Sequence, residues 1–201
     1  MRLVSPVGCV RAAAGVAVAL LVGGGTAVAA PTASAATAGQ GAVAQLHPLS
    51  ALSAQRLATA DLVAAAKYGT GSPVDDPARE QQVLDAVARQ AEEAGADPGA
   101  TVRIFRDQIE ANKVVQRALH RKWDADPASA PAERPDLAEV RERINRLNGE
   151  LVGAIAASAP ARGAPYCAGV LTVTTAHVRH EQRLDALHTV ALVRASRSVC
   201  G

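Results

Sequence analysis

Aromatic side chains are scarce in this sequence. Phe, Tyr and Trp make up 2% of the 201 residues, whereas hydrophobic residues as a whole make up 49%. Ala, Val and Leu therefore supply the apolar content, which favours close-packed helices over a β-sandwich. A chain with so few aromatic rings also lacks a platform on which nucleic-acid bases could stack.

Neither basic nor acidic residues are in large excess. The chain has 21 basic and 19 acidic residues, a net charge of +2, which does not favour electrostatic capture of nucleic acid. No segment shows the strict alternation of a half-buried strand, and no short-period repeat is present. We therefore predict an all-α, single-domain bundle of about five to six helices, for which the chain is long enough.

The N-terminal segment lacks an apolar run long enough for a good membrane span. Arg2 and Arg11 give it a positive start, residues 12–22 are apolar, and three glycines then interrupt the run. Small-residue cleavage sites follow at residues 27–29 and 33–35. This pattern is typical of a secretory signal peptide; the alternative is an uncleaved anchor.

We expect residues 1–35 to be a cleaved signal peptide, with the mature chain starting between Ala30 and Ala38. Residues 36–48 are predicted to be a flexible segment, and residues 49–201 the helical domain. The protein would be secreted or periplasmic, with no stable membrane association after cleavage.

Cysteine is rare as well, with three residues in the whole chain. Loss of the signal peptide removes Cys9 and leaves Cys167 and Cys200. An even pair in an exported chain predicts one disulfide bond, worth about 3.5–4 kcal/mol if loop entropy is decisive. The alternative is two free thiols.

Five helical segments are expected after the signal peptide, each followed by turn residues. Asp76, Asp97 and Asp136 provide start signals, because Asp is a preferred N-cap, and the first two precede a proline. Gly95 provides a stop signal. The expected helices cover residues 49–68, 77–94, 98–123, 137–157 and 167–200, although the β-prone residues 172–175 make the start of the last one uncertain.

Several polar residues occupy positions on apolar helix faces. Arg56 and Lys67 are eleven residues apart, almost a whole number of turns, so both point from one face of the first helix. Asn112 and Gln116 interrupt the apolar stripe of the third helix, and Arg141 that of the fourth. Because buried polar groups need partners, these side chains must meet something polar.

The cations on these faces outnumber the acids. Internal carboxylates, from Glu80, Asp61 or Asp107, could pair with any one of them. They do not suffice for the whole set, which consists of Arg56, Lys67, Arg79 and Arg141. Arginine binds carboxylates through its two-pronged guanidinium, so the set predicts a pocket for a small anion.

The spacing of these residues resembles that of the all-helical chorismate mutases. In that family an arginine, a lysine eleven residues later, an aspartate nine beyond and then an Arg-Glu pair line the pocket. Here they are Arg56, Lys67, Asp76, Arg79 and Glu80.

Other features resemble the secreted subclass, and the resemblance extends over about residues 49–200. Asn112 and Gln116 match a polar pair on the third helix, and Trp123 closes that helix. Arg141 matches an arginine that the short intracellular mutases supply from a second subunit, and that the secreted subclass supplies from the same chain. A disulfide in the C-terminal region fits the subclass too.

The resemblance implies conversion of chorismate to prephenate by a Claisen rearrangement, with no cofactor and no metal. Arg56 and Arg141 would grip the substrate carboxylates, and Lys67 and Gln116 would donate to the ether oxygen. Glu80 would accept from the ring hydroxyl. The remaining implied positions are Arg79 and Asn112, which would support a carboxylate, and Asp76, which would order the turn. Asn112 departs from the family, where a smaller residue is common.

Three other interpretations remain open. The first is a non-catalytic exported module that binds a small dicarboxylate, and the second is an interaction protein whose polar stripe pairs internally and leaves no cavity. The third is a metal site at His177, His180 and His188, which lacks an obvious acidic or cysteine ligand, so surface histidines are preferred. A homodimer is possible by resemblance.

Overall fold

The computed structural model describes residues 33–201, with side chains from residue 39 onward. This part of the chain contains α-helices and one short 3-10 helix, and no strand. The α-helices are α1 (Ala33–Lys67), α2 (Pro77–Glu93), α3 (Pro98–Ala125), α4 (Leu137–Ala157), α5 (Ala159–Arg162), α6 (Cys167–Glu181) and α7 (Ala186–Ala195), and the 3-10 helix η1 is Pro127–Ser129. The predicted all-α class is confirmed. Residues 1–32, with most of the predicted signal peptide and Cys9, lie outside the described residues.

Helix α1 begins earlier than expected. The segment 36–48, predicted to be flexible, is helical and continuous with the rest of α1. Pro48 lies inside the helix, where its missing N–H removes one backbone hydrogen bond. The side chains of Ala42 and Leu46 are nevertheless buried in the core. Tertiary packing thus stabilises a helical segment that local sequence signals did not predict.

Helices α2, α3 and α4 begin at the three predicted aspartates. The Asp76 carboxylate accepts from the Arg79 N–H at 3.0 Å, and that of Asp97 accepts from the Ala100 N–H at 2.8 Å. Asp136 caps α4 in the same way. These caps satisfy backbone donors that have no partner within the helix.

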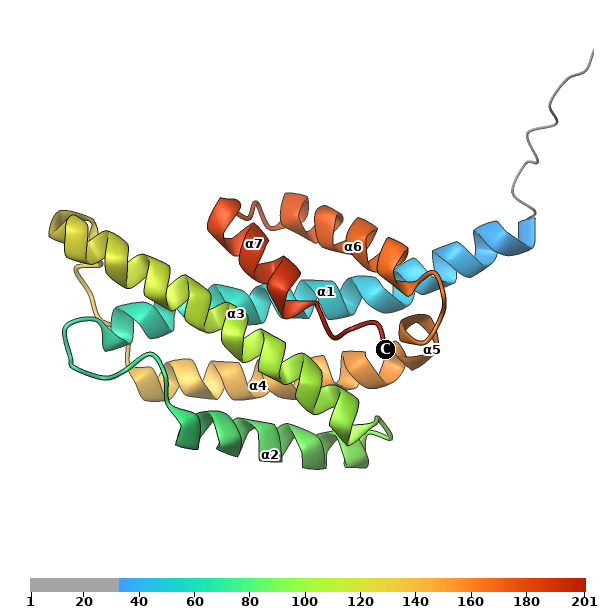
Figure 1. Ribbon diagram of the computed structural model, residues 1–201, viewed down its shortest axis with the longest axis horizontal. Helices are drawn as coiled ribbons and strands as arrows, with labels where there is room; N and C mark the ends of the chain where they lie inside the picture. Colours follow the sequence, from blue (N-terminus) through green and yellow to red (C-terminus); the bar gives the residue numbers. More distant parts are fainter. Residues whose placement is uncertain (1–32) are drawn as a thin grey trace, which may run out of the picture. The chain divides into compact units, whose positions relative to one another are not determined.

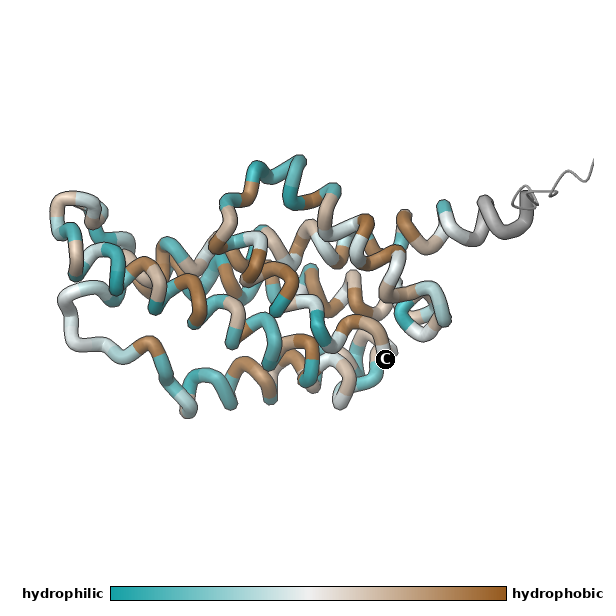
Figure 2. Tube along the Cα trace, turned by 45° about the horizontal axis from the view of Figure 1, so that its top comes forward, coloured by the Kyte–Doolittle hydropathy of each residue, from teal (hydrophilic) through white to brown (hydrophobic). Residues whose placement is uncertain are grey.

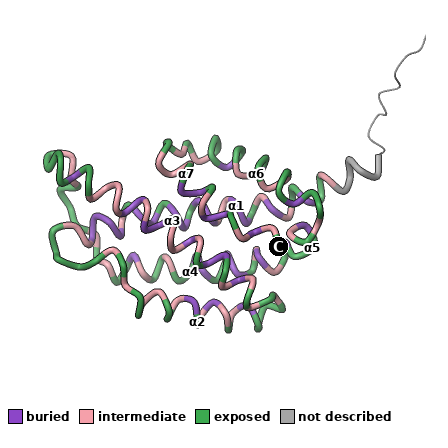
Figure 3. Tube along the Cα trace, in the orientation of Figure 1, coloured by how far each residue is buried: buried purple, intermediate pink, exposed green. Residues whose placement is uncertain are grey.

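The core forms where α1 packs against α3, α4 and α6, and where α2 packs against α3 and α4 (Figure 1). Apolar positions recur along the long helices between hydrophilic ones (Figure 2), and buried positions recur along them in the same manner (Figure 3). Phe105, Leu49, Leu151 and Ile155 are among the fully buried side chains of the largest cluster. This packing fixes the faces of α1 to α4 relative to one another.

The last predicted helix is instead two helices. Residues 182–185 separate α6 from α7. Arg183 has a positive φ of 51°, which ends a helix, and the Asp185 carboxylate caps α7 by accepting from the His188 N–H at 2.8 Å. The prediction of one helix over 167–200 was therefore wrong, because helical spacing of the apolar residues continues across the break.

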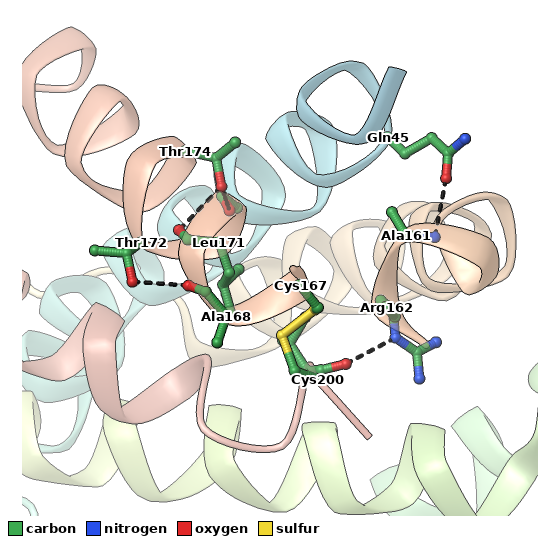
Figure 4. Close-up of a disulfide and its surroundings, with 11 residues drawn as sticks. Gln45, Ala161, Arg162, Cys167, Ala168, Leu171, Thr172, Thr174 and Cys200 are labelled. Carbon is green, nitrogen blue, oxygen red and sulfur yellow. Dashed lines mark hydrogen bonds between the residues drawn. A yellow bond between two sulfur atoms is a disulfide. The ribbon is translucent and has the colours of Figure 1, made fainter. Parts of the chain in front are cut away.

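The predicted disulfide is present. Cys167 and Cys200 are bonded, with Cα atoms 5.8 Å apart and a sequence separation of 33 (Figure 4). Nearby, the Arg162 side chain donates to the backbone carbonyl of Val199 at 3.0 Å and to that of Ile155 at 3.1 Å. The chain end is therefore held to the start of α6 and to the end of α4.

None of the helices in the described part of the chain combines the length and the apolar character needed to cross a membrane.

Candidate active site

Helices α1 to α4, with the loop before α2, line a pocket of about 110 Å³ that is open to solvent on one side. Every residue named above as a candidate for substrate binding or catalysis lines it: Arg56, Lys67, Asp76, Arg79, Glu80, Asn112, Gln116 and Arg141. Apolar walls come from α1, α2, α3, α4 and the loop, through Val63, Val74, Val83, Ile109, Leu137 and Ile144, and a further cation is Lys113. All of these residues belong to one chain.

Arg56 is the most deeply buried cation of the pocket, with 4% of its surface exposed. Its Nε donates to the Asn148 side-chain oxygen on α4 at 2.8 Å, and its guanidinium carbon lies 5.6 Å from the Phe105 ring centroid. Burial lowers its pKa to about 10, so the group stays charged at neutral pH. Its Nη1 is buried and has no hydrogen-bond acceptor in the protein.

Lys67, three turns further along α1, lies at the end of the helix. Its Nζ donates to the Pro73 carbonyl at 2.8 Å and more weakly to that of Val74 at 3.4 Å, which ties the loop before α2 to the pocket. Burial lowers the pKa of Lys67, opposed by the charge of Asp76 and reinforced by that of Arg141. The ammonium group thus lies among charges of both signs, with its position set by the loop.

Glu80 is held by Lys113, which was not among the predicted site residues. Lys113 on α3 donates to both oxygens of the Glu80 carboxylate at 3.2 Å. It also contacts Asp75 at 3.1 Å and Glu110. Burial would lower the pKa of Lys113, but hydrogen bonds to these three carboxylates outweigh it and raise the pKa.

A sequence signal for Lys113 did exist. It lies four residues after Ile109 and three before Gln116, so it belongs to the same helix face as the polar pair. Asn148, which orients Arg56, lies four residues after Ile144 and three before Leu151, so it also occupies an apolar helix face, but its partner cannot be inferred from one helix alone.

The two amides on α3 contact one another. Gln116 donates through its side-chain nitrogen to the Asn112 side-chain oxygen at 2.6 Å. Both residues are buried, and the Gln116 side-chain oxygen has no hydrogen-bond partner. This bond uses one of the two hydrogens of the Gln116 amide, so the other hydrogen can still be donated to a group in the pocket.

The remaining pocket residues come from α2 and α4. Asp76 has two functions in the turn, since its carboxylate caps α2 and its backbone N–H donates to Glu80 at 3.3 Å. Arg79 makes a local hydrogen bond to Gln82 at 3.2 Å, and Arg141 reaches the pocket from α4.

The pocket carries an excess of positive charge. Five lining residues are cationic and two are acidic, and the carboxylate of Glu80 is already bound by Lys113. Buried cations without a protein partner are costly, so the arrangement favours a small ligand with more than one negative charge. The carboxylates proposed as internal partners do not serve the predicted pocket arginines: Asp61 bonds His188 and Asp107 accepts from the Ser198 N–H.

The three histidines considered as metal ligands are not brought together as a group. His188 lies between Asp61 and Asp185, with its ring nitrogens 3.1 and 2.8 Å from their carboxylates. Hydrogen bonds to Asp61 and Asp185 raise the pKa of His188 to about 9 against the effect of burial. His188 therefore forms an ion-pair network between α7 and α1.

Known proteins are similar to this chain in sequence and in fold. Residues 48–117 match the family described as chorismate mutase type II. The chain is 40% identical over 187 residues to the secreted chorismate mutase of Mycolicibacterium smegmatis, covering 93% of this chain and 98% of that protein. It is 35% identical over 156 residues to the secreted chorismate mutase of Mycobacterium tuberculosis, covering 78% of each.

A solved structure agrees with these relatives. The chorismate mutase from Burkholderia phymatum superimposes with a TM-score of 0.75 at 37% identity, over 80% of this chain and 98% of that one. This coverage means that most of this chain has the fold of that structure. The chain therefore belongs to the type II chorismate mutase family, together with relatives that are named as secreted.

Proposed function

We propose that the pocket between α1 and α4 binds chorismate and converts it to prephenate by an intramolecular Claisen rearrangement. The observation that carries this proposal is Arg56, a buried and charged guanidinium whose Nη1 has no partner in the protein and which lines a pocket rich in cations. The rearrangement needs no nucleophile and no obligatory proton transfer. It needs a site that holds the folded substrate and stabilises the charge that develops on the ether oxygen.

We assign the carboxylates of the substrate to Arg56 and Arg141, which reach the pocket from α1 and α4. Arg79 and Asn112 would support one of them. Two guanidinium groups from two helices can fix both ends of a dianion, which selects one conformer. The hydrogen bond from Asn148 would orient Arg56 for this contact.

The ether oxygen is assigned to Lys67 and Gln116. Both can donate a hydrogen bond, and their positions are fixed by the loop carbonyls and by Asn112 respectively. Preorganised donors of this kind stabilise developing negative charge without reorganisation. Glu80, immobilised by Lys113, would accept from the ring hydroxyl, and Asp76 would order the turn that carries it.

Turnover by the mature chain, followed as loss of chorismate absorbance, tests the proposal. Arg56→Lys keeps a charge but loses the two-pronged geometry, so we expect kcat/KM to fall by roughly 10²-fold or more. Arg106→Ala removes an exposed arginine on α3 and should leave turnover unchanged. Binding of chorismate with no turnover in the unaltered protein would instead favour the non-catalytic dicarboxylate-binding module, for which the named relatives give no support.

We also propose that the protein is exported and that it forms a homodimer. The names of the relatives support secretion, and N-terminal sequencing of protein from the culture medium should give a start between Ala30 and Ala38.

A homodimer is consistent with the exposed Val190 and Val193, one turn apart on α7, and light scattering would measure it. Since the pocket is lined by one chain, each subunit would carry its own site.

A further inference from the structure

Three side chains with metal-binding atoms meet on the side of the bundle where α1 packs against α6 (Figure 1). They are His47 on α1, and His177 and Glu181, four residues apart on α6. The three ligand atoms all lie within 4.8 Å of one another. None of these residues lines the pocket described above, so the cluster is independent of the proposed function.

Both imidazole rings contact the same carboxylate, that of Glu181. The Nε2 atom of His47 lies 3.0 Å from one oxygen of Glu181, and the Nε2 atom of His177 lies 3.1 Å from the other. Their ring centroids are 5.5 Å apart with planes inclined at 60°. Both rings thus direct the same nitrogen toward a common point instead of stacking.

Two imidazoles and a carboxylate form a ligand set that zinc and similar divalent transition metals prefer. Metal–ligand bonds of about 2.0–2.2 Å in a tetrahedral site place ligand atoms roughly 3.3–3.5 Å apart. The two nitrogen–oxygen distances here are shorter by only a few tenths of an ångström. Small side-chain rotations would therefore open the cluster around an ion without moving either helix.

The helix faces that carry the cluster are held together by neighbouring contacts. One turn away on each helix, the buried hydroxyls of Ser50 and Thr174 are hydrogen-bonded at 3.1 Å. On the C-terminal side of Glu181, the Gln182 amide donates to the Ala51 carbonyl at 3.2 Å. Such fixed surroundings reduce the entropy lost when three ligands are ordered around an ion.

The cluster is open to solvent. The side chains of His47, His177 and Glu181 are 33%, 62% and 42% exposed. An ion can therefore enter directly, and water can fill a fourth position, as in zinc sites with three protein ligands.

We propose that His47, His177 and Glu181 bind one divalent transition metal ion of the zinc class, which cross-links α1 to α6. The sequence predicted no metal site for this chain. The proposed site uses His177, one of the three histidines that were considered as metal ligands above. His47 and Glu181 are 134 residues apart in sequence, so the ion would close a long loop, which stabilises the folded state.

Calorimetric titration of tag-free, metal-free protein with zinc chloride tests the site. We expect one ion per chain. His47→Gln, His177→Gln and Glu181→Gln, which keep a polar side chain but remove a good ligand, should each weaken binding at least tenfold. His180→Gln is the matched control, because His180 is an exposed histidine on the same helix outside the cluster, and it should bind zinc as the unaltered protein does.

Thermal unfolding gives a second readout. Free zinc at a hundred times its dissociation constant should raise the midpoint by about 5–10 °C, and the rise should be absent in His177→Gln. Chorismate turnover should be the same in all four variants. The proposal is wrong if no stoichiometric binding is measured, if the three cluster variants bind zinc as tightly as the unaltered protein, or if His180→Gln abolishes binding.

Discussion

At the scale of single residues, the pocket depends on polar side chains that occupy otherwise apolar helix faces. Arg56, Lys67 and Arg141 were identified because each occupies a position where an apolar residue is expected, and all three line one pocket. Lys113 was not identified, since its three carboxylate partners come from the loop before α2, from α2 itself and from α3. A periodicity argument treats one helix at a time and cannot show such a convergence.

Gln116 leads to a prediction about pH. An amide donates a hydrogen bond at any pH, so the unaltered enzyme should keep its kcat/KM through neutral and mildly alkaline pH. In Gln116→Glu the carboxyl must be protonated to donate, and its ordinary pKa is about 4.3. We expect kcat/KM of this variant to fall as pH rises through the pKa of the new carboxyl, which burial would raise.

The pH–rate profiles of both proteins, measured with chorismate from pH 4 to 9, decide this point. Parallel profiles would show that residue 116 does not donate to the reacting oxygen. Stability should be measured at each pH, so that unfolding is not mistaken for loss of activity.

At the scale of helices, start signals were reliable and boundaries set by tertiary packing were not. The three Asp caps lie where local rules placed them. The early start of α1 depends on the burial of Ala42 and Leu46, and the break between α6 and α7 depends on the positive φ of Arg183. The early start of α1 is not encoded in a short window of sequence, whereas the start of α7 does carry a local signal, the N-cap Asp185.

The contact between α7 and α1 should depend on pH through His188. Its pKa is about 9 in the folded protein and 6.5 in its ordinary state. A raised pKa means that the charged form stabilises the fold, so this contribution is complete below pH 6.5 and is lost as pH rises through 9. We expect the unfolding midpoint of the unaltered protein to fall across this window more than that of His188→Gln.

Calorimetric melting at pH 6 and pH 9.5 would measure the difference between the two proteins. Each kcal/mol lost from the free energy of unfolding lowers the unfolding midpoint by about 2–4 °C in a domain of this size. Equal shifts in both proteins would mean that His188 contributes no pH-dependent stability. His180→Gln, which alters an exposed histidine on α6, serves as the comparison.

At the scale of the whole molecule, the candidate active-site pocket and the disulfide lie in different parts of the chain. The pocket is built by α1 to α4, whereas Cys167 and Cys200 join the start of α6 to the chain end. Replacing both cysteines by serine should lower the free energy of unfolding by about 3.5–4 kcal/mol, seen as a lower denaturant midpoint. The folded variant should retain its kcat, and loss of kcat under conditions where it is folded would contradict this separation.

The variant Lys67→Ala distinguishes a pocket that stabilises the transition state from one that only binds a dianion. Its kcat and KM for chorismate should be measured beside those of Lys122→Ala, which removes an exposed lysine on α3. Because Lys67 is assigned to the ether oxygen, we predict that kcat falls roughly 10²–10³-fold while the protein remains folded and the control is unaffected. Near-normal turnover by folded Lys67→Ala would mean that Lys67 does not stabilise the transition state.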